Sequence, residues 1–193
     1  RAAAGFACQL GRTDGLTIEN IRFENCFADG LHVNGGVKNG TVKNLSGHTE
    51  DDLIALNAYD WDNSSINFGA IENLTVEGVN CGDGQNVHKS FRIQPGIYPY
   101  KNGEKEDCRI TNLTVKNVSG VTTFKMYLQT PAYTDVPEKE IGVGRIENVT
   151  FEHISADTTS PVDKQPNYLS GNPVTGNFAT FEIGSNVKNI RFS

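Results

Sequence analysis

Residues 71–76 read Ile-Glu-Asn-Leu-Thr-Val, and this short pattern recurs along the chain. Each copy has an aliphatic residue, a variable residue, an asparagine and a second aliphatic residue, in that order. The copies lie at residues 18–23, 42–45, 71–76, 110–115, 146–151 and 187–192. Their asparagines are 24, 29, 39, 36 and 41 residues apart. Such variable spacing is typical of short repeats that carry insertions, and it argues against a helical repeat of fixed length.

Within each copy, apolar and polar residues alternate with a period of two, which indicates strands bounded by Gly, Asn and Asp turns. No stretch of a dozen residues carries a helical stripe, so we expect little helix. A second apolar strand follows most copies of the pattern. These strands lie at residues 31–33, 53–56, 91–93, 124–128 and 178–183. The sequence therefore predicts an all-β, single-stranded parallel β-helix in which like residues stack on successive coils.

The recurring asparagine has a place in this prediction. It would sit in the turn that enters a strand, where Asn tolerates the left-handed backbone region and bonds to neighbouring groups. On stacked coils these side chains would form a ladder. Residues 57–69, 94–107 and 157–177 interrupt the rhythm of the repeats. We interpret them as loops, and the first two are expected to wall a groove.

Composition limits the class of protein. The 193 residues suffice for one domain, which we place over residues 1–193 as coils of what looks like a longer solenoid. A net charge of −6 argues against a nucleic-acid surface, and the sequence has no apolar run long enough to span a membrane. The four cysteines lack the Cys-x-x-Cys spacing of zinc sites. Cys26, aligned with Val79 and Val118, is interpreted as a core residue, and a disulfide between coils stays open.

Two acidic turns, each followed by a strand, are the strongest candidates for chemistry. Asp29 precedes the strand that starts at Leu31, and Asp51 and Asp52 precede the strand that starts at Leu53. Aligning Leu31 with Leu53 would place Asp29 one coil below Asp51. Carboxylates on adjacent strands would then lie several ångströms apart, as in pairs that cleave glycosidic bonds. Asp is also an ordinary turn residue, and that simpler interpretation remains for each one alone.

Basic groups follow on the next predicted strands. His88 and Lys89 precede one strand, Arg92 lies within it, and Lys125 lies within the next. Alternation predicts that His32, Arg92 and Lys125 share one outward face, which is either a solvated surface or a site for an anionic sugar.

Aromatic side chains near these strands could contact a sugar ring. Tyr59 and Trp61 follow the second acidic turn, and Tyr127 lies two residues beyond Lys125. Covering the surface of the coils is the alternative role for these rings.

Together these residues resemble glycoside hydrolase family 28, the polygalacturonase-like enzymes. That family carries Asn-Thr-Asp-Gly, Gly-Asp-Asp-x-Ile-Ala-Ile, Gly-His-Gly and Arg-Ile-Lys on successive coils. Residues 28–31, Ala-Asp-Gly-Leu, are similar to the first motif, and residues 50–56, Glu-Asp-Asp-Leu-Ile-Ala-Leu, to the second. Residues 87–89, Val-His-Lys, and 124–127, Phe-Lys-Met-Tyr, stand where the third and fourth belong. The third lacks its flanking glycines, and the fourth has Lys for Arg and Tyr for Lys.

The resemblance implies a right-handed, pectin-lyase-like β-helix and inverting hydrolysis of a pectin-like or other uronate-containing polysaccharide. It implies that Asp52 is the general acid, that Asp29 and Asp51 hold the water, and that His88 orients the acid. Lys125 would bind a carboxylate or hydroxyl of the substrate. No metal or cofactor is implied, and a secreted, periplasmic or cell-surface location fits such a substrate.

Two alternatives remain open from the sequence. A polysaccharide lyase on the same fold would bind calcium at the acidic cluster and abstract a proton with Lys89, Arg92 or Lys125. A non-catalytic β-helix would bind a glycan and cleave nothing, since one scaffold hosts many functions.

Overall fold

The computed structural model describes residues 5–62, 64–82, 90–128, 142–156 and 179–193. The predicted all-β class is confirmed, and these residues contain no helix. The first sheet has the strand order β1-β3-β5-β7-β11-β13, and the second has the order β14-β12-β10-β6-β4-β2. All pairs within both sheets are parallel.

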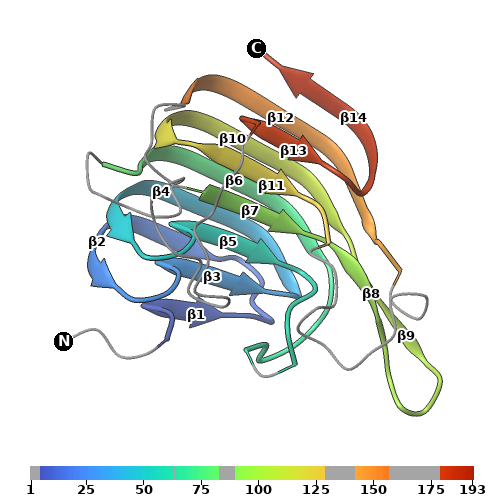
Figure 1. Cartoon of the computed structure of the whole chain (residues 1–193). Coiled ribbons are helices and arrows are strands. Elements are labelled where there is room, and N and C mark those ends of the chain that lie inside the picture. The colour runs from blue at the N-terminus through green and yellow to red at the C-terminus, as the bar shows by residue number, and fades with distance from the viewer. Residues whose placement is uncertain (1–4, 63, 83–89, 129–141, 157–178) are drawn as a thin grey trace.

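The strands of the first sheet are short: β1 (Cys8–Leu10), β3 (Leu31–Asn34), β5 (Ile54–Asn57), β7 (Ser90–Gln94), β11 (Thr123–Met126) and β13 (Phe181–Ile183). Most of those of the second sheet are long: β2 (Thr17–Cys26), β4 (Val37–Thr49), β6 (Ile71–Asn80), β10 (Ile110–Val121), β12 (Arg145–Ala156) and β14 (Asn186–Phe192). Apart from a hairpin between β7 and β10, successive strands of the chain lie in the two sheets in turn. Each new strand pairs with the strand that the chain last added to the same sheet (Figure 1).

Like residues stack along the first sheet and fill the core. Leu31 pairs with Ile54, Ile54 with Phe91, Phe91 with Phe124, and Phe124 with Phe181. The ring centroid of Phe124 lies 5.4 Å from that of Phe91 and 4.8 Å from that of Phe181. Apolar side chains of the second sheet close the other side of this core. Burial of these columns supplies the main stabilisation of the fold.

The sequence-based alignment of the acidic turns is wrong by one residue. Leu31 pairs with Ile54, so Asp29 lies beside Asp52 and not beside Asp51. Residues 53–56 are all apolar, and a period of two cannot choose between two registers in such a run. The remaining column is as predicted, because His32, Ala55, Arg92 and Lys125 are in register.

Asparagines occupy the left-handed region and form a ladder, as the sequence predicts, but they lie within the long strands and not in turns before them. One column contains Asn39, Asn73, Asn112, Asn148 and Asn189, with φ between 53° and 57°. Each amide nitrogen donates to the asparagine of the preceding strand at 2.8 to 3.0 Å. The ladder continues to Asp14 through Asn39.

A second left-handed column runs five residues further along the strands. Its members are Asn20, Asn44, Gly78, Asn117 and His153. The repeats at residues 18–23 and 42–45 belong to this column, and their equivalence with residues 71–76 is therefore corrected. Both columns follow the same aliphatic-x-Asn pattern, so the sequence alone merged them.

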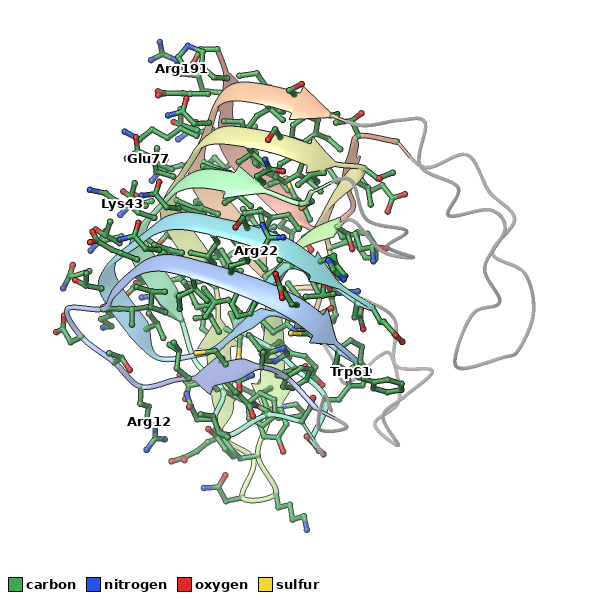
Figure 2. All side chains as sticks on the ribbon, turned by 90° about the vertical axis from the view of Figure 1, so that its left-hand side faces the viewer. Arg12, Arg22, Lys43, Trp61, Glu77 and Arg191 are labelled. Atoms are coloured by element: carbon green, nitrogen blue, oxygen red, sulfur yellow. The ribbon has the colours of Figure 1, made fainter. Side chains whose placement is uncertain are left out.

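The outer face of the second sheet is charged. Lys43, Glu77 and Arg191 point away from the body of the protein in Figure 2. Cross-strand ion pairs occur on it, and Lys116 Nζ lies 3.4 Å from Glu77 Oε2. This face therefore needs no covering element.

The predictions for two of the three loops and for Cys26 can be compared with the structure. Residues 94–107 form an antiparallel hairpin of β8 (Gly96–Pro99) and β9 (Lys105–Cys108) instead of an irregular loop. Of the predicted segment 57–69, Asn57 ends β5, and residues 58–62 and 64–69 include backbone bonds to the first sheet, such as that from the Tyr59 amide to the Gln94 carbonyl. Residues 157–177 lie outside the described residues. Cys26 is a buried thiol, as expected, but it pairs with Thr49 and does not align with Val79. Among the described residues, no helix could cross a membrane.

The asparagine ladder yields a stability prediction. Asn112→Ala and Asn112→Gly both remove two side-chain hydrogen bonds, but only glycine accepts a φ of 56° without strain. We expect the alanine variant to be less stable than the glycine variant by about 1 kcal/mol. Urea unfolding of both variants measures this difference. An alanine variant as stable as the glycine variant would contradict the role of the left-handed backbone.

Candidate functional site

The acidic turns meet on the edge where β3 and β5 begin. Asp29 precedes β3, and Asp51 and Asp52 precede β5. One oxygen of each of the three carboxylates lies within 4.8 Å of one oxygen of the others. Asp29 and Asp52 are buried, with 4% and 1% of their surface exposed, whereas Asp51 is partly exposed. The parallel register thus gathers three carboxylates in one small volume.

The backbone fixes the distance between the two turns. The Asp52 amide donates to Asp29 Oδ1 at 3.1 Å, and the Gly30 amide donates to the Asp52 carbonyl at 3.1 Å. A Cβ at Gly30 would lie 2.8 Å from the Leu53 carbonyl oxygen and from the ring of Phe23. Only glycine permits this approach, so Gly30 brings the two acidic turns together.

Asp52 is held as an anion by two cations and a hydroxyl. Arg92 Nε lies 2.6 Å from Asp52 Oδ2, and Lys125 Nζ lies 3.5 Å from Asp52 Oδ1. Ser90 Oγ also donates to Asp52 Oδ1. Burial would raise the pKa of Asp52, but Arg92, Lys125 and these hydrogen bonds outweigh it and hold the pKa well below its usual range. Arg92 is correspondingly held charged, since Asp52 raises its pKa against the effect of burial.

Asp29 has the opposite character. Burial, reinforced by the charges of Asp51 and Asp52, raises its pKa to about 7, although a hydrogen bond from His32 works against this. Asp29 Oδ2 lies 2.6 Å from His32 Nδ1. Two neighbouring carboxyls of the same residue type therefore differ in proton affinity, because Asp52 forms ion pairs with Arg92 and Lys125 whereas burial dominates at Asp29.

His32 is enclosed between two carboxylates. Its Nε2 lies 2.7 Å from Asp60 Oδ2, and its ring stacks on Phe6 with centroids 3.7 Å apart. The side chain has no exposed surface. Burial would lower the pKa of His32, but the hydrogen bonds and charges of Asp29 and Asp60 raise it to about 9.

The predicted outward face is a buried column. His32 and Arg92 are 0% and 5% exposed, so a solvated stripe is excluded for these two residues. Residues 58–62 and 64–69 lie against the His32 end of the column, where the Ile66 amide donates to Asn34 Oδ1 and Gln9 donates to the Ser64 carbonyl. His32 therefore contacts protein groups and is shielded from a substrate, contrary to its predicted binding role.

The aromatic candidates separate into two groups. The Trp61 ring lies under Arg92, with Cζ 5.7 Å from its centroid, and its side chain projects at the margin of the protein (Figure 2). Tyr127 donates to Glu182 Oε2 at 3.4 Å beside the lysine end of the column. Tyr59 is 3% exposed and packs against Phe68 and Tyr98 with centroids 5.6 and 5.9 Å away. No face of the Tyr59 ring is left for a sugar, which corrects its predicted role.

Sequence reasoning missed several members of the cluster. Asp60, Asn34, Asn57, Ser90 and Gln94 are buried polar residues of this region. Four of them could have been found from their spacing along the strands. Asn34, Asn57 and Gln94 align on adjacent strands, and Ser90 lies two residues before Arg92. No pattern in the sequence marks Asp60, which lies in an irregular segment. The predicted His88 and Lys89 lie outside the described residues.

Charge balance decides what the cluster can hold. Three carboxylates within 4.8 Å have enough oxygens for a divalent cation. However, Asp52 already contacts the guanidinium of Arg92 and the ammonium of Lys125, and both would repel such an ion. The cluster is thus explained as a set of carboxylates balanced by protein cations, with Asp51 turned to the surface.

In comparisons with protein-family models, curated proteins and solved structures, no significant match was found.

The ion pair at Asp52 yields a stability prediction. Asp52→Asn leaves the buried Arg92 without its principal counter-charge and should lower the free energy of unfolding by about 3 kcal/mol. Asp51→Asn changes a partly exposed carboxylate and should cost less than about 1 kcal/mol. Chemical denaturation of the two variants measures both effects. Equal losses would show that the Asp52–Arg92 pair is not the main support of the cluster.

Proposed function

We propose that this chain forms a right-handed parallel β-helix that hydrolyses glycosidic bonds in a polysaccharide. Alternation of the strands between two parallel sheets supports the β-helix. The observation that carries the enzymatic proposal is the cluster of Asp29, Asp51 and Asp52 within 4.8 Å. Glycoside hydrolysis needs one carboxyl to protonate the leaving oxygen and another carboxylate to activate water or attack the sugar. The resemblance to glycoside hydrolase family 28 points to the same residues.

The geometry favours a different proton donor from the one that the resemblance implies. Asp52 is a poor acid, because Arg92 and Lys125 lower its pKa. Asp29 is buried, and its two oxygens engage the Asp52 amide and His32. Asp51 is the partly exposed member, and a general acid must reach the glycosidic oxygen. In this proposal Asp51 donates the proton, while Asp29 and Asp52 hold the attacking water.

The resemblance implies that the reaction inverts the anomeric centre. In most inverting enzymes the two carboxyls are about 6.5 to 9.5 Å apart, with water between them. The oxygens here lie within 4.8 Å, so the water would be held beside the Asp29–Asp52 pair and not between acid and base. The released sugar would then carry the anomeric configuration opposite to that of the cleaved bond.

The substrate proposed is a uronate-containing, pectin-like polysaccharide. Lys125, on the strand beside Arg92, retains 12% side-chain exposure and presents a positive charge next to the carboxylates. A carboxylate or hydroxyl of the sugar could pair with this ammonium, and Trp61 offers a ring at the margin of the same region. Such a substrate fits a secreted, periplasmic or cell-surface protein.

The lyase alternative is less well supported. A lyase of the kind considered would need calcium at the acidic cluster, and the two cations at Asp52 oppose it. A glycan-binding protein without catalysis needs no paired acid and base, and it leaves the proximity of the three carboxylates without a role.

Cleavage of polysaccharides by variants tests the proposal. The wild-type protein is incubated with polygalacturonate and with a panel of neutral and acidic polysaccharides, and reducing ends are measured. We expect Asp51→Asn to lower the rate by about 100-fold or more, because the general acid is lost. Glu104→Gln, a change on the exposed turn of the β8–β9 hairpin, should leave the rate unchanged.

Proton NMR of the first product formed tests the stereochemistry, and the inverted anomer is expected. Equal rates for Asp51→Asn and wild type would exclude Asp51 as the acid. A retained anomer would contradict the inverting reaction while leaving hydrolysis in place.

A further inference from the structure

A buried chain of polar groups leads from the acidic cluster to Asp60, in the segment that follows β5. Asp29 contacts His32 at 2.6 Å, and His32 contacts Asp60 at 2.7 Å. Exposed surface is absent at His32 and Asp60, and it is 4% at Asp29. Three titratable groups in a row at such depth cost desolvation free energy, which contacts among themselves must offset.

The geometry fixes the state of the imidazole. Each ring nitrogen of His32 faces a carboxylate oxygen. Only the imidazolium form can donate a hydrogen bond at both nitrogens at once. A neutral ring would point one lone pair at a carboxylate. The pKa of His32, raised to about 9 by Asp29 and Asp60, favours this protonated ring, and with Asp29 ionised the arrangement is a carboxylate–imidazolium–carboxylate sequence.

Asp60 is itself anchored from two strands. Asn34 Nδ2 donates to Asp60 Oδ2 at 2.9 Å, and Asn57 Nδ2 donates to Asp60 Oδ1 at 3.2 Å. Each asparagine comes two residues after a member of the polar column, and the two asparagines pair with each other across β3 and β5. These contacts keep Asp60 ionised, and the pKa of Asp60 is lowered mainly by His32 and Asn34 in spite of burial.

We propose that Asp60 is a positioning residue for the reaction, acting through His32 to fix the orientation and charge environment of Asp29. The inference rests on the proposed function, since Asp29 is one of the carboxylates that would hold water. Asp60 itself touches no substrate. Groups that orient a reacting residue through a histidine commonly change activity by 10- to 100-fold when removed from metal sites, and a similar effect is expected here.

The charges that face this chain are few and can be named. His32 faces Asp29 and Asp60. Asp29 faces His32, Asp51 and Asp52, and it also interacts with Arg92. Among the groups named here, Asp60 is the one that comes from the described part of the segment after β5 and does not belong to the acidic cluster. A substitution of Asp60 therefore changes the charge beside His32 without altering any of the three carboxylates of the acidic cluster.

The test compares Asp60→Asn with Asp62→Asn. Asp62 is an exposed carboxylate of the same segment, so its substitution removes an equal charge nearby. In proton–nitrogen NMR spectra of histidine-labelled protein, wild-type His32 should show two ring N–H signals, assigned by their loss in His32→Gln. We expect Asp60→Asn to lose the Nε2 proton signal and to deprotonate at lower pH, while Asp62→Asn matches wild type.

Kinetics supply the second readout, on the polysaccharide that the wild-type protein cleaves. Asp60→Asn should lower kcat by about 10- to 100-fold with little change in KM, and the alkaline limb of its pH profile should move to lower pH. Asp62→Asn should change neither kcat nor the alkaline limb of the pH profile. A folded Asp60→Asn variant with wild-type kcat and pH profile would overturn the proposal and leave Asp60 a purely structural anchor.

The two proposals fail in different ways. If the wild-type protein cleaves nothing, hydrolysis is rejected, and the NMR arm still decides whether Asp60 controls His32. If His32 keeps both protons and its titration in Asp60→Asn, the positioning role is rejected whatever the activity. If Asp60→Asn does not fold, Asn57→Ala weakens the same anchor at one hydrogen bond and is read by the same two measurements.

Discussion

The hydrogen-bond register between β3 and β5 is the constraint on which the site depends. It places the Asp52 amide 3.1 Å from Asp29 Oδ1, and it sets His32 beside Ala55 in the column that leads to Arg92 and Lys125. A slip by one residue would send every polar side chain of this column into the core. Buried leucine, isoleucine and phenylalanine on the opposite face prevent the slip, so the apolar core defines the geometry of the acidic cluster.

Buried charges in this cluster are arranged in two separate groups. Arg92 and Lys125 neutralise Asp52, and His32 lies between Asp29 and Asp60. Each group has a cation for its carboxylates, which reduces the cost of burial. Asp51 interacts with Asp29 of one group and with Arg92 of the other, and it is partly exposed. This division explains why neighbouring carboxyls of one residue type can take different roles as proton donor, water ligand and ionised partner.

The sequence was sufficient to predict the parallel strands, the asparagine ladder and the three carboxylates. These features could be predicted because alternation with a period of two and the recurring Asn-centred pattern depend on neighbouring residues, and the sequence of one chain shows them directly. The register of residues 53–56 was not predictable, because four successive apolar residues fit either face. Asp60 was missed because its role comes from an irregular segment folding back over β3. The burial of His32 was likewise set by that segment and not by β3, and Tyr59 belongs to the segment itself.

Hydrolysis of a glycosidic bond is the central claim, and oxygen-18 water tests it most directly. The wild-type protein would digest polygalacturonate, or the polysaccharide of the panel that it cleaves, in labelled water, with mass spectrometry of the first products. Hydrolysis places one labelled oxygen at each new reducing end, because the water attacks the anomeric carbon. Fragments that carry the label would support the account. Unlabelled fragments with an unsaturated, ultraviolet-absorbing end would establish elimination instead and contradict it.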